Sequence, residues 1–579
     1  MTSQAEAIQT VRDRLLGLMH ADGYWEGRLS SSALSTATAV SALSLAGEPT
    51  DVAGIDSGLR WLAEHQNADG GWGDTIDSPS NLATTLLAIA AVKLAGSRAT
   101  ACPGVSAALE KAEAQASSRT GATPRGVVQA LRAEYGEDRT FAVPILMNCG
   151  LAGLVDWDAI PGLPFEMAVV PPRWYRVLRL HVVSYALPAL IAIGLLLDDR
   201  HPSRNFLRQR LRRAMTPRVV EILQQIQPEH GGFLEATPLT SFVAMGLIPR
   251  FGRDHPITAR CLGFLRRSQR ADGSWPIDTN LSVWLTTAAV ASLASAGALS
   301  RIDRERTALW IAARQQTAPH PYTHAAPGGW SWTHLPGGVP DVDDTAGAIL
   351  ALTELDHRDG LIPGVRWLLD LQNRDGGWPT FCRGWGKLPF DKSAPDLTAH
   401  ALRAIHVAGV AANASAQERA IRGGLQYLRA TQRSDGSWLP LWFGNQAAFG
   451  LTNPVLGTSR VLRALELLDP GGPASVGGVG YLLQSQNADG GWGGDCHVAS
   501  TPEETALAVA ALTPWATTST CQSAIARGVD HLIRDVAYAL DRPSPIGLYF
   551  AHLWYSERLY PVLWMLDALG RVAGSYRRT

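Results

Sequence analysis

The sequence predicts an all-α protein made of two α/α-barrel domains, and three observations carry this prediction. A short turn motif with Gln and Trp recurs along the chain, each copy lies between two helical patterns, and one long interval separates the copies into two groups. Repetition of this kind is typical of architectures in which each unit buries its apolar face only against its neighbours. A helical hairpin cannot bury both faces alone, so the hairpins are expected to close into rings.

The repeated turn follows the pattern Gln-[Asn/Arg]-x-Asp-Gly-[Gly/Ser]-Trp. Its Asp-Gly pair allows a tight reversal because glycine takes positive φ angles without steric cost. A Gln amide at the end of a helix can bond to the backbone, so we expect the motifs to tie outer helices together and to be poor catalytic candidates. The full copies are QNADGGW from Gln66, QRADGSW from Gln269, QNRDGGW from Gln372, QRSDGSW from Gln432 and QNADGGW from Gln486, and degenerate copies end at Trp25, Phe233 and Trp330.

A helix is predicted on each side of the turn. Segments such as LRWLAEHQ and VRWLLDLQ precede it, and they space apolar residues three and four apart. After it comes a second helix, rich in Ala and Leu, that tends to open with Thr, as in NLATTLLAIAAVKLAG and DLTAHALRAI. Small residues would let the second helices pack closely around an interior, which predicts that they form the inner layer of each barrel.

The long interval between the copies at Gln66 and Gln269 divides the chain. We assign residues 20–275 to an N-terminal α/α-barrel domain and residues 276–579 to a C-terminal, catalytic one, on which residues 1–19 are expected to pack. The interval contains LHVVSYALPALIAIGLLL, residues 180–197, which approaches the length of a membrane span. Its polar residues and Arg-rich flanks favour a buried core helix, with a contact to one face of a membrane as the alternative.

The composition limits the function. Of the 579 residues, 46% are apolar and 18% are charged, whereas an average soluble domain has about 25% charged residues. The net charge is −1 and the pI is near 7, so no long-range field attracts nucleic acid, and no nucleic-acid partner is expected. Six scattered cysteines without a C-x-x-C pair, and an N-terminus without a signal-peptide pattern, favour reduced thiols and a cytosolic location.

One inner helix departs from the other repeats. The stretch GGVPDVDDTAGAILAL places Asp341, Asp343 and Asp344 within four positions. When the second helices are aligned on their Thr-Ala pair, Asp343 lies opposite Asp396 and Glu503. A carboxylate at the start of a helix caps free N–H groups and favours the helix dipole. Capping therefore explains one or two of the acids and leaves the third unexplained.

The extra carboxylates have three possible roles: a general acid, a metal site or capping alone. Three carboxylates within one turn repel, so at least one is expected to keep its proton to a higher pH than a free Asp. A protonated acid among apolar and aromatic walls is a proton donor, and this is the role we favour. Clustered Asp is also how proteins hold Mg²⁺, which makes metal binding the main rival.

The turn repeats and the motif Asp-Val-Asp-Asp-Thr-Ala together resemble the class II terpene cyclases, most closely the squalene–hopene cyclase family, over nearly the whole chain. In that family an Asp-x-Asp-Asp-Thr-Ala motif lies on a double α/α-barrel that sits in one leaflet of a membrane. The resemblance implies that Asp343 protonates a terminal alkene, with Asp341 and Asp344 as supporting carboxylates. It also implies that His400, in APDLTAHALRA, bonds to the acid and increases its strength, and that Asp396 joins this network at the substrate.

Aromatic faces stabilise cations without attacking them, and the resemblance places five aromatic residues on a cavity wall. At the far end of the cavity the chain departs from the family. The segment ALSTATAV has no acid where hopene-forming enzymes carry a Glu, and Leu553 occupies an aromatic position. The acid end of the cavity therefore matches the family better than the opposite end, which sets the length and the conformation of the substrate and the way the last cation is quenched. The five expected wall residues are Trp284, Trp332, Phe381, Trp442 and Tyr549.

The resulting hypothesis is an isomerase or lyase that cyclises a linear polyprene, squalene or a related long isoprenoid, by protonation from Asp343, without cofactor or metal. Because such a substrate enters from lipid, we expect a peripheral or monotopic contact on the cytoplasmic side of a membrane. The resemblance also implies a homodimer.

Two other enzyme classes remain as alternatives. A carboxylate-based α/α-barrel glycoside hydrolase would need two acids across an open polar cleft. A zinc enzyme resembling the protein prenyltransferases would rest on Asp495, Cys496 and His497, although neighbours in sequence rarely form a tetrahedral site without a distant ligand. A non-catalytic helical scaffold would leave the three clustered aspartates without a role.

Overall fold

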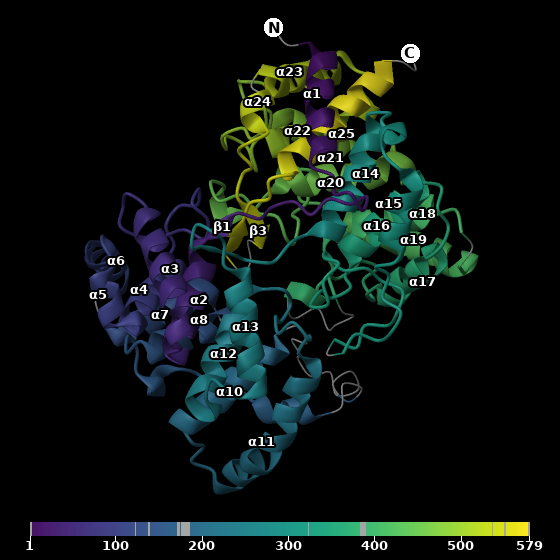
Figure 1. The fold of residues 1–579 in the computed structure, drawn as a ribbon. Helices are drawn as coiled ribbons and strands as arrows, with labels where there is room; N and C mark the ends of the chain where they lie inside the picture. Colours follow the sequence, from purple (N-terminus) through teal and green to yellow (C-terminus); the bar gives the residue numbers. More distant parts are fainter. Residues whose placement is uncertain are drawn as a thin grey trace.

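The protein folds almost entirely into helices, which confirms the predicted all-α class (Figure 1). Only four strands of two or three residues accompany the helices in the part of the chain that the structure describes. This computed structural model describes residues 3–121, 123–136, 139–170, 174, 186–321, 323–381, 389–410, 412–534, 536–548 and 552–576.

Among the described residues of the first half of the chain, five helices form a closed inner ring. Each packs against the next, and the last returns to the first. Nearly every residue of the first two is buried, as expected of helices that are covered on all sides. In order around the ring they are α2 (Ala33–Ala46), α4 (Leu82–Ala95), α8 (Arg139–Leu151), α10 (Leu187–Arg200) and α12 (Thr237–Phe251).

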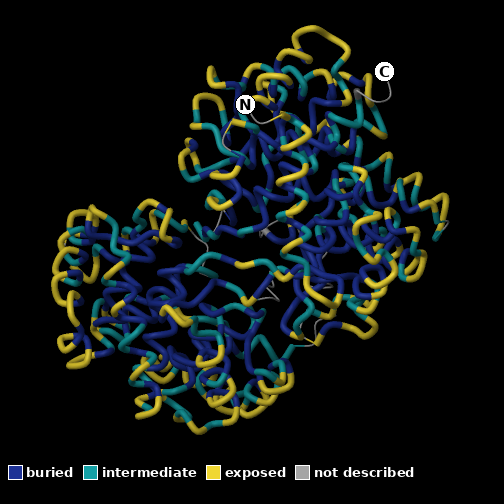
Figure 2. Tube along the Cα trace, turned by 45° about the horizontal axis from the view of Figure 1, so that its top comes forward, coloured by how far each residue is buried: buried dark blue, intermediate teal, exposed yellow. Residues whose placement is uncertain are grey.

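An outer layer of amphipathic helices covers this ring. In Figure 2 the inner segments are dark blue and the exposed residues lie on the outer segments. The outer helices are α3 (Val52–Glu64), α5 (Ser97–Ala101), α6 (Val105–Thr120), α7 (Pro124–Tyr135), α11 (Phe206–Ile226) and α13 (Pro256–Ser268).

The second half repeats the arrangement with six inner helices, so the prediction of two α/α barrels is confirmed. The inner ring runs α14 (Ser282–Ser295), α16 (Val342–Glu354), α18 (Pro395–Val407), α20 (Pro454–Leu468), α22 (Pro502–Leu512) and α25 (Tyr560–Tyr576), and α25 returns to α14. The outer helices are α15 (Arg304–Ala312), α17 (Leu361–Leu371), α19 (Ala414–Thr431), α21 (Pro473–Gln484), α23 (Ser519–Arg534), the short α24 (Val536–Ala539) and α1 (Gln4–Gly17).

The repeated turn ties neighbouring helices together, as the sequence predicts. In one copy the amide Nε2 of Gln432 donates to Gly436 O and to Ala474 O of the next outer helix, both at 2.9 Å. The backbone N–H of Trp438 donates to the Thr458 hydroxyl of an inner helix at 3.1 Å, which explains why the inner helices open with Thr. The other four full copies make the same three bonds.

The first helix of the chain packs in the second ring. α1 lies against α25 and supplies its outer cover, at the top of Figure 1. At the degenerate turn that follows, the indole Nε1 of Trp25 donates to Leu15 O at 2.8 Å. The Trp25 backbone N–H donates to the hydroxyl of Thr286 in α14 at 3.0 Å. This turn therefore joins α1 to the first inner helix of the second half and closes the six-helix ring.

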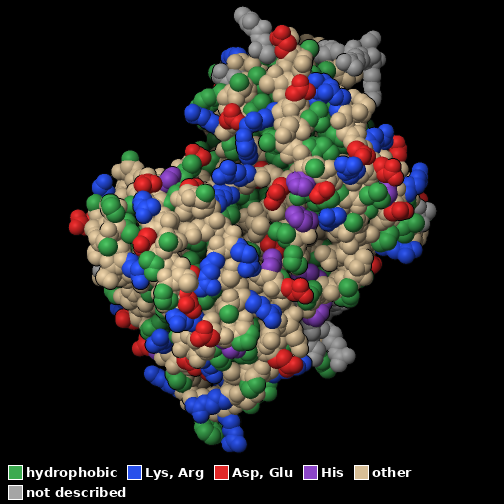
Figure 3. Space-filling model, in the orientation of Figure 1, with side chains coloured by type: hydrophobic (Ala, Val, Ile, Leu, Met, Phe, Trp, Pro, Cys, Tyr) green, Lys and Arg blue, Asp and Glu red, His purple; other side chains and the backbone are tan. Residues whose placement is uncertain are grey.

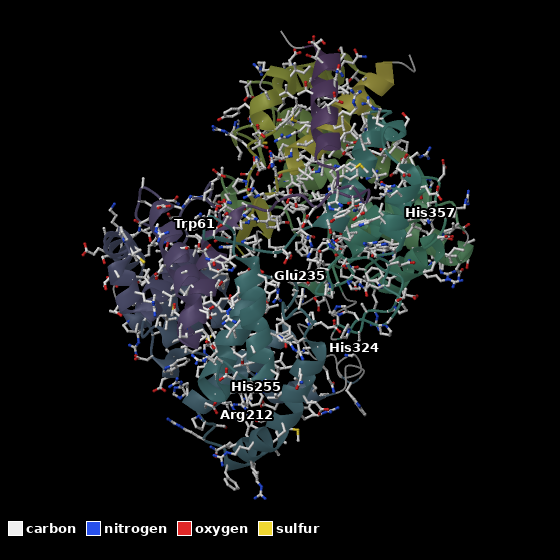
Figure 4. The ribbon with its side chains drawn as sticks, viewed as in Figure 1. Trp61, Arg212, Glu235, His255, His324 and His357 are labelled. Atoms are coloured by element: carbon white, nitrogen blue, oxygen red, sulfur yellow. The ribbon has the colours of Figure 1, made fainter. Side chains whose placement is uncertain are left out.

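The chain crosses between the two rings at two short strands. β1 (Ser31–Ser32) pairs antiparallel with β2 (Trp275–Pro276), and the predicted division between residues 275 and 276 falls within β2. Trp275 closes the first ring, because its backbone N–H donates to the hydroxyl of Thr36 in α2 at 3.0 Å. Glu235, labelled near the centre of Figure 4, accepts a bond from the Gly337 N–H at 2.8 Å and links the two halves.

The apolar stretch at residues 180–197 is a buried helix where the structure describes it. Residues 187–197 belong to α10, and most of them are buried inside the first ring; residues 180–185 lie outside the described residues. Within the described ranges, no helix combines the length and the apolar content needed to cross a bilayer.

Candidate active site

A cavity of about 300 Å³ is lined by residues from both halves of the chain, and most of its wall is apolar. Four of the five aromatic residues expected there lie on this wall, namely Trp284, Trp332, Phe381 and Trp442. The fifth, Tyr549, lies outside the described residues. Leu553, where the resemblance leads us to expect an aromatic residue, also borders the cavity.

The aromatic rings of the wall support one another. The Trp442 ring meets Phe381 edge-on, with the ring centres 5.9 Å apart, and its Nε1 donates to the Thr380 hydroxyl at 3.1 Å. Trp284 meets Tyr560 edge-on at 4.9 Å. Edge-to-face packing of this kind fixes ring orientation. Further wall aromatics that the sequence analysis missed are Tyr135, Phe141, Phe242, Phe390, Phe443, Tyr555 and Tyr560. The last two belong to the aromatic-rich segment LWYSERLY.

The three clustered aspartates lie at the start of α16 and all border the cavity. Asp341 is the N-cap, and its Oδ1 accepts a bond from the Asp344 backbone N–H at 2.9 Å. The Asp341 backbone N–H donates to O of Trp330, in a degenerate turn, at 3.0 Å. The repeat therefore places the motif at the cavity, and capping accounts for one of the three acids.

Asp343 carries the most contacts of the three carboxylates. Its Oδ1 lies 2.5 Å from Nδ1 of His400 and 3.6 Å from Nη1 of Arg460. Its Oδ2 accepts a bond from Nε1 of Trp284 at 2.9 Å. The Asp343 side chain keeps 17% of its surface exposed, whereas Asp341 and Asp344 are almost fully buried.

These surroundings shift the pKa values of the three carboxyls in opposite directions. Burial raises the pKa of Asp341 and of Asp344, and the charge of Asp341 raises the pKa of Asp344 further. These shifts have the direction expected for a carboxyl that keeps its proton to a higher pH, and they fall on this pair. Burial also raises the pKa of Asp343, but the charges of Arg460 and His400 outweigh it and hold that pKa well below its usual range. The cluster therefore holds its proton most tightly on the buried pair and has its strongest acid at Asp343.

His400 and Asp396 both come from α18, four residues apart, and they play different parts. His400 contacts the carboxylate of Asp343, and burial lowers its own pKa. Asp396 accepts a bond from the Leu441 backbone N–H at 3.2 Å and is not among the residues that line the cavity. Burial, followed by the charge of Asp343, raises the pKa of Asp396 to about 6.

Two charged residues of the site escaped the sequence analysis. Arg460 lies on α20, in the segment GTSRVLRALELL, which also carries Arg463 and Glu466, so no local pattern distinguished Arg460. Asp278 also borders the cavity, and burial, followed by the charge of Glu235, raises its pKa well above the usual value. No repeat pattern marks Asp278, because it follows β2 in a connecting segment.

The residues proposed for zinc do not come together with others of their kind. Asp495 accepts a bond from the Tyr481 hydroxyl at 2.8 Å, and Cys496 is exposed. Throughout the described part of the chain, no group of three or more His, Cys, Asp and Glu side chains is arranged to hold a metal ion.

Comparison with known proteins identifies the family. Residues 281–567 match the squalene-hopene cyclase C-terminal domain, residues 8–128 match the squalene-hopene cyclase N-terminal domain, and residues 179–380 match the prenyltransferase alpha-alpha toroid domain. The chain belongs to the squalene–hopene cyclase family, and it is an enzyme of the class II terpene cyclase type.

Individual relatives are distant but cover most of the chain. A squalene–hopene cyclase of Alicyclobacillus acidocaldarius is 26% identical over 99% of this chain and 98% of its own length. A probable squalene–hopene cyclase of Sinorhizobium fredii is 25% identical over 91% and 89%, respectively. Enfumafungin synthase efuA of Hormonema carpetanum is 25% identical over 97% of this chain, which spans only 48% of that protein.

A solved structure shares the fold. The ent-copalyl diphosphate synthase from Streptomyces platensis superposes with a TM-score of 0.58 at 21% identity, and the match covers 98% of this chain and 99% of that one.

Proposed function

We propose that the protein cyclises a linear polyprene, squalene or a related long isoprenoid, and that Asp343 is the general acid that starts the reaction. One observation carries this proposal. At the edge of an aromatic-lined cavity, the most exposed of three clustered carboxylates is also the one that contacts His400, Arg460 and Trp284. This arrangement favours the anion that remains after the proton has left.

The chemistry begins with the transfer of a proton from the Asp343 carboxyl to the terminal carbon of an alkene. The π electrons of that alkene form the new C–H bond, and the neighbouring carbon becomes a cation. The π electrons of the next alkene attack this cation, which closes a ring and leaves a new cation further along the chain. This step repeats until the last cation loses a proton or captures water. An alkene is a very weak base, so the strength of the acid matters more than its abundance in the protonated form.

Asp341 and Asp344 supply the stored proton. Their raised pKa values keep a proton in the cluster, within one helical turn of Asp343. An apolar substrate that fills the cavity removes water from Asp343 and raises its pKa, because burial disfavours the charged form. Substrate binding therefore favours movement of the stored proton onto Asp343 at the moment when an alkene lies against it.

The aromatic wall would stabilise the cations that form after the proton transfer. Trp332, Phe381 and Trp442 present rings to the same cavity, and a desolvated cation gains about 2 kcal/mol from one well-placed ring. Few groups on the wall can attack a cation, which protects the intermediates until the last ring has closed. The same composition disfavours a glycoside hydrolase, whose two acids would face an open polar cleft.

A substrate screen tests the proposal. The purified protein in detergent is incubated with squalene, with shorter polyprene alcohols and with polyprene diphosphates, and the organic extract is read by mass spectrometry. Cyclic isomers or hydrates of one of these substrates are the expected result. If every substrate is recovered unchanged from folded protein, the cyclase proposal is wrong.

Arg460 provides a prediction on pH dependence. Replacing it with Gln removes the positive charge that lies 3.6 Å from Asp343. An opposite charge favours the carboxylate, so its removal raises the pKa of Asp343, which then stays protonated to higher pH but becomes a weaker acid. In Arg460→Gln, the pH at which cyclisation falls off is expected to move upward while the maximal rate drops. Exposed Arg366→Gln on α17 is the control; a profile identical to it would contradict the role of Arg460.

We also propose a membrane contact, at α11. The described part of the apolar stretch at residues 180–197 is buried, so it provides no such surface. α11 instead exposes Phe206 and Leu207, at 68% and 75%. Exposed arginines follow at positions 208, 210 and 213, and they would meet anionic headgroups. This tip, green and blue, lies at the bottom of Figure 3. Arg212, labelled in Figure 4, anchors the helix through Glu166 at 3.1 Å and Asp198 at 2.7 Å.

The membrane contact predicts a loss of vesicle binding. The double variant Phe206→Ser, Leu207→Ser is expected to bind vesicles of anionic phospholipid at least about tenfold more weakly, because each side chain loses about 1.5–3 kcal/mol of burial. Co-sedimentation measures the change. Ile362→Ser, which alters an exposed apolar residue of α17, is the control; equal binding by both variants would place the contact elsewhere.

A further inference from the structure

His552 and Glu134 form an ion pair at the cavity wall. Nδ1 of His552 lies 3.2 Å from Oε1 of Glu134, which belongs to the outer helix α7 of the first half. The imidazole also lies against the Tyr135 ring, with the ring centres 5.8 Å apart. His552 is 29% exposed and Glu134 is 15% exposed, so the pair is shielded but not sealed from the cavity.

His552 borders two cavities. It lines the apolar cavity described above and also a second, more polar pocket, whose lining includes Arg119, Glu134 and Gln446. None of the three clustered aspartates borders this second pocket. The imidazole therefore stands where the apolar cavity gives way to a more polar pocket, apart from the acids.

The backbone holds His552 in an uncommon conformation. Its φ angle is 48°, in the left-handed region that residues with a side chain rarely adopt. Such a conformation persists when the surroundings determine it, and it is frequent at functional sites. Here the neighbouring strands supply the restraint. Leu553 pairs with Leu548 of the β3–β4 ladder (Ile546–Leu548 and Leu553–Tyr555), and the Trp554 N–H donates to buried Asp74 at 2.9 Å.

We infer that His552 is the base that ends the reaction and that Glu134 positions it. This inference rests on the proposed cyclisation. The Glu134 carboxylate accepts a bond from Nδ1–H, so the imidazole proton stays on Nδ1 and the lone pair of Nε2 remains available. The final cation forms on a carbon near this end of the cavity. Nε2 takes a proton from the neighbouring carbon, and the electrons of the broken C–H bond form the product alkene.

The proton balance of the whole reaction then closes. Asp343 gives one proton to the first alkene and His552 receives one from the last cation, so the product is an isomer of the substrate. The imidazolium formed is stabilised by Glu134 and returns its proton to solvent through the polar pocket. Without the base, the cation persists until water from that pocket captures it or another site removes a proton.

Product analysis of three variants tests the inference. His552→Gln keeps the size and polarity of the side chain but removes the base, and Glu134→Gln keeps the shape but removes the charge. The share of the wild-type alkene among cyclised products is expected to fall at least about tenfold in His552→Gln, since a positioned base contributes about 10²–10⁴-fold. Hydrates and isomeric alkenes are expected to rise. Exposed His406→Gln on α18 is the matched control.

The outcomes separate the base from the cyclase itself. A smaller shift in the same direction is expected in Glu134→Gln and a partial recovery in Glu134→Asp, which a merely structural role would not produce. If His552→Gln does not fold, Glu134→Gln decides. A product profile equal to that of His406→Gln, or a wild-type product that is itself a hydrate, overturns the inference and leaves cyclisation intact. A wild-type protein that cyclises no polyprene overturns both.

Discussion

Replacing Asp343 with Asn is expected to reduce product formation by at least about 10³-fold, which lies within the range for loss of a general acid. The amide has nearly the shape of the carboxyl, and its single oxygen can accept the bond from either Trp284 or His400, which contact different oxygens of Asp343. It has no acidic proton to give to an alkene. Because Asp341 and Asp344 are almost fully buried, they are not expected to replace it.

The readout is the initial rate of cyclic product, measured by mass spectrometry with the best substrate of the screen. Asp370→Asn, an exposed residue of α17, controls for the loss of a charge. Far-ultraviolet circular dichroism and substrate protection against heat show whether the variant still folds and binds. A folded Asp343→Asn that cyclises at more than about a tenth of the wild-type rate would remove Asp343 from the role of general acid.

Replacing His400 with Ala is expected to slow cyclisation by about 10–100-fold, because a hydrogen bond to a charged group contributes about 1.5–3 kcal/mol. His400 contacts Oδ1 of Asp343 at 2.5 Å. Without it, the carboxylate left after proton transfer loses a donor, and the pKa of Asp343 rises toward the ordinary range. The acid becomes weaker at the step where strength matters most.

Rescue distinguishes this role from a structural one. His400→Gln restores an N–H donor near Asp343 and is expected to recover part of the rate, whereas His406→Ala, six residues along the same helix and exposed, is expected to change nothing. Equal rates for His400→Ala and the wild type would show that Arg460 and Trp284 alone support the acid.

The fold was predictable because each full copy of the repeated turn makes the same hydrogen bonds. Each Gln, Gly and Trp of the turn makes one fixed set of bonds, so the five copies mark five outer helices and the inner helices that follow. The sequence could not show which inner helix each turn would reach. Trp25 precedes α2 along the chain, yet its N–H bonds to Thr286 in α14, and nothing local distinguishes these two partners.

The residues of the site could be predicted where they depart from the repeat pattern, and they could not be predicted elsewhere. Asp341, Asp343 and Asp344 exceed what capping requires, and this excess drew attention to α16. Arg460 and His552 belong to no recurring pattern of the sequence. A single charged residue acquires meaning only from what it contacts, and those contacts join residues far apart in sequence.

The packing of α1 against α25 has a consequence for synthesis on the ribosome. α1 is synthesised long before α25, yet α1 covers α25 and buries its own Ala7, Val11 and Leu15. During translation the apolar face of α1 therefore stays uncovered until α25 has been made. In that interval α1 is expected to be a client for a chaperone, and a fragment that begins after Trp25 would lack the helix that covers α25.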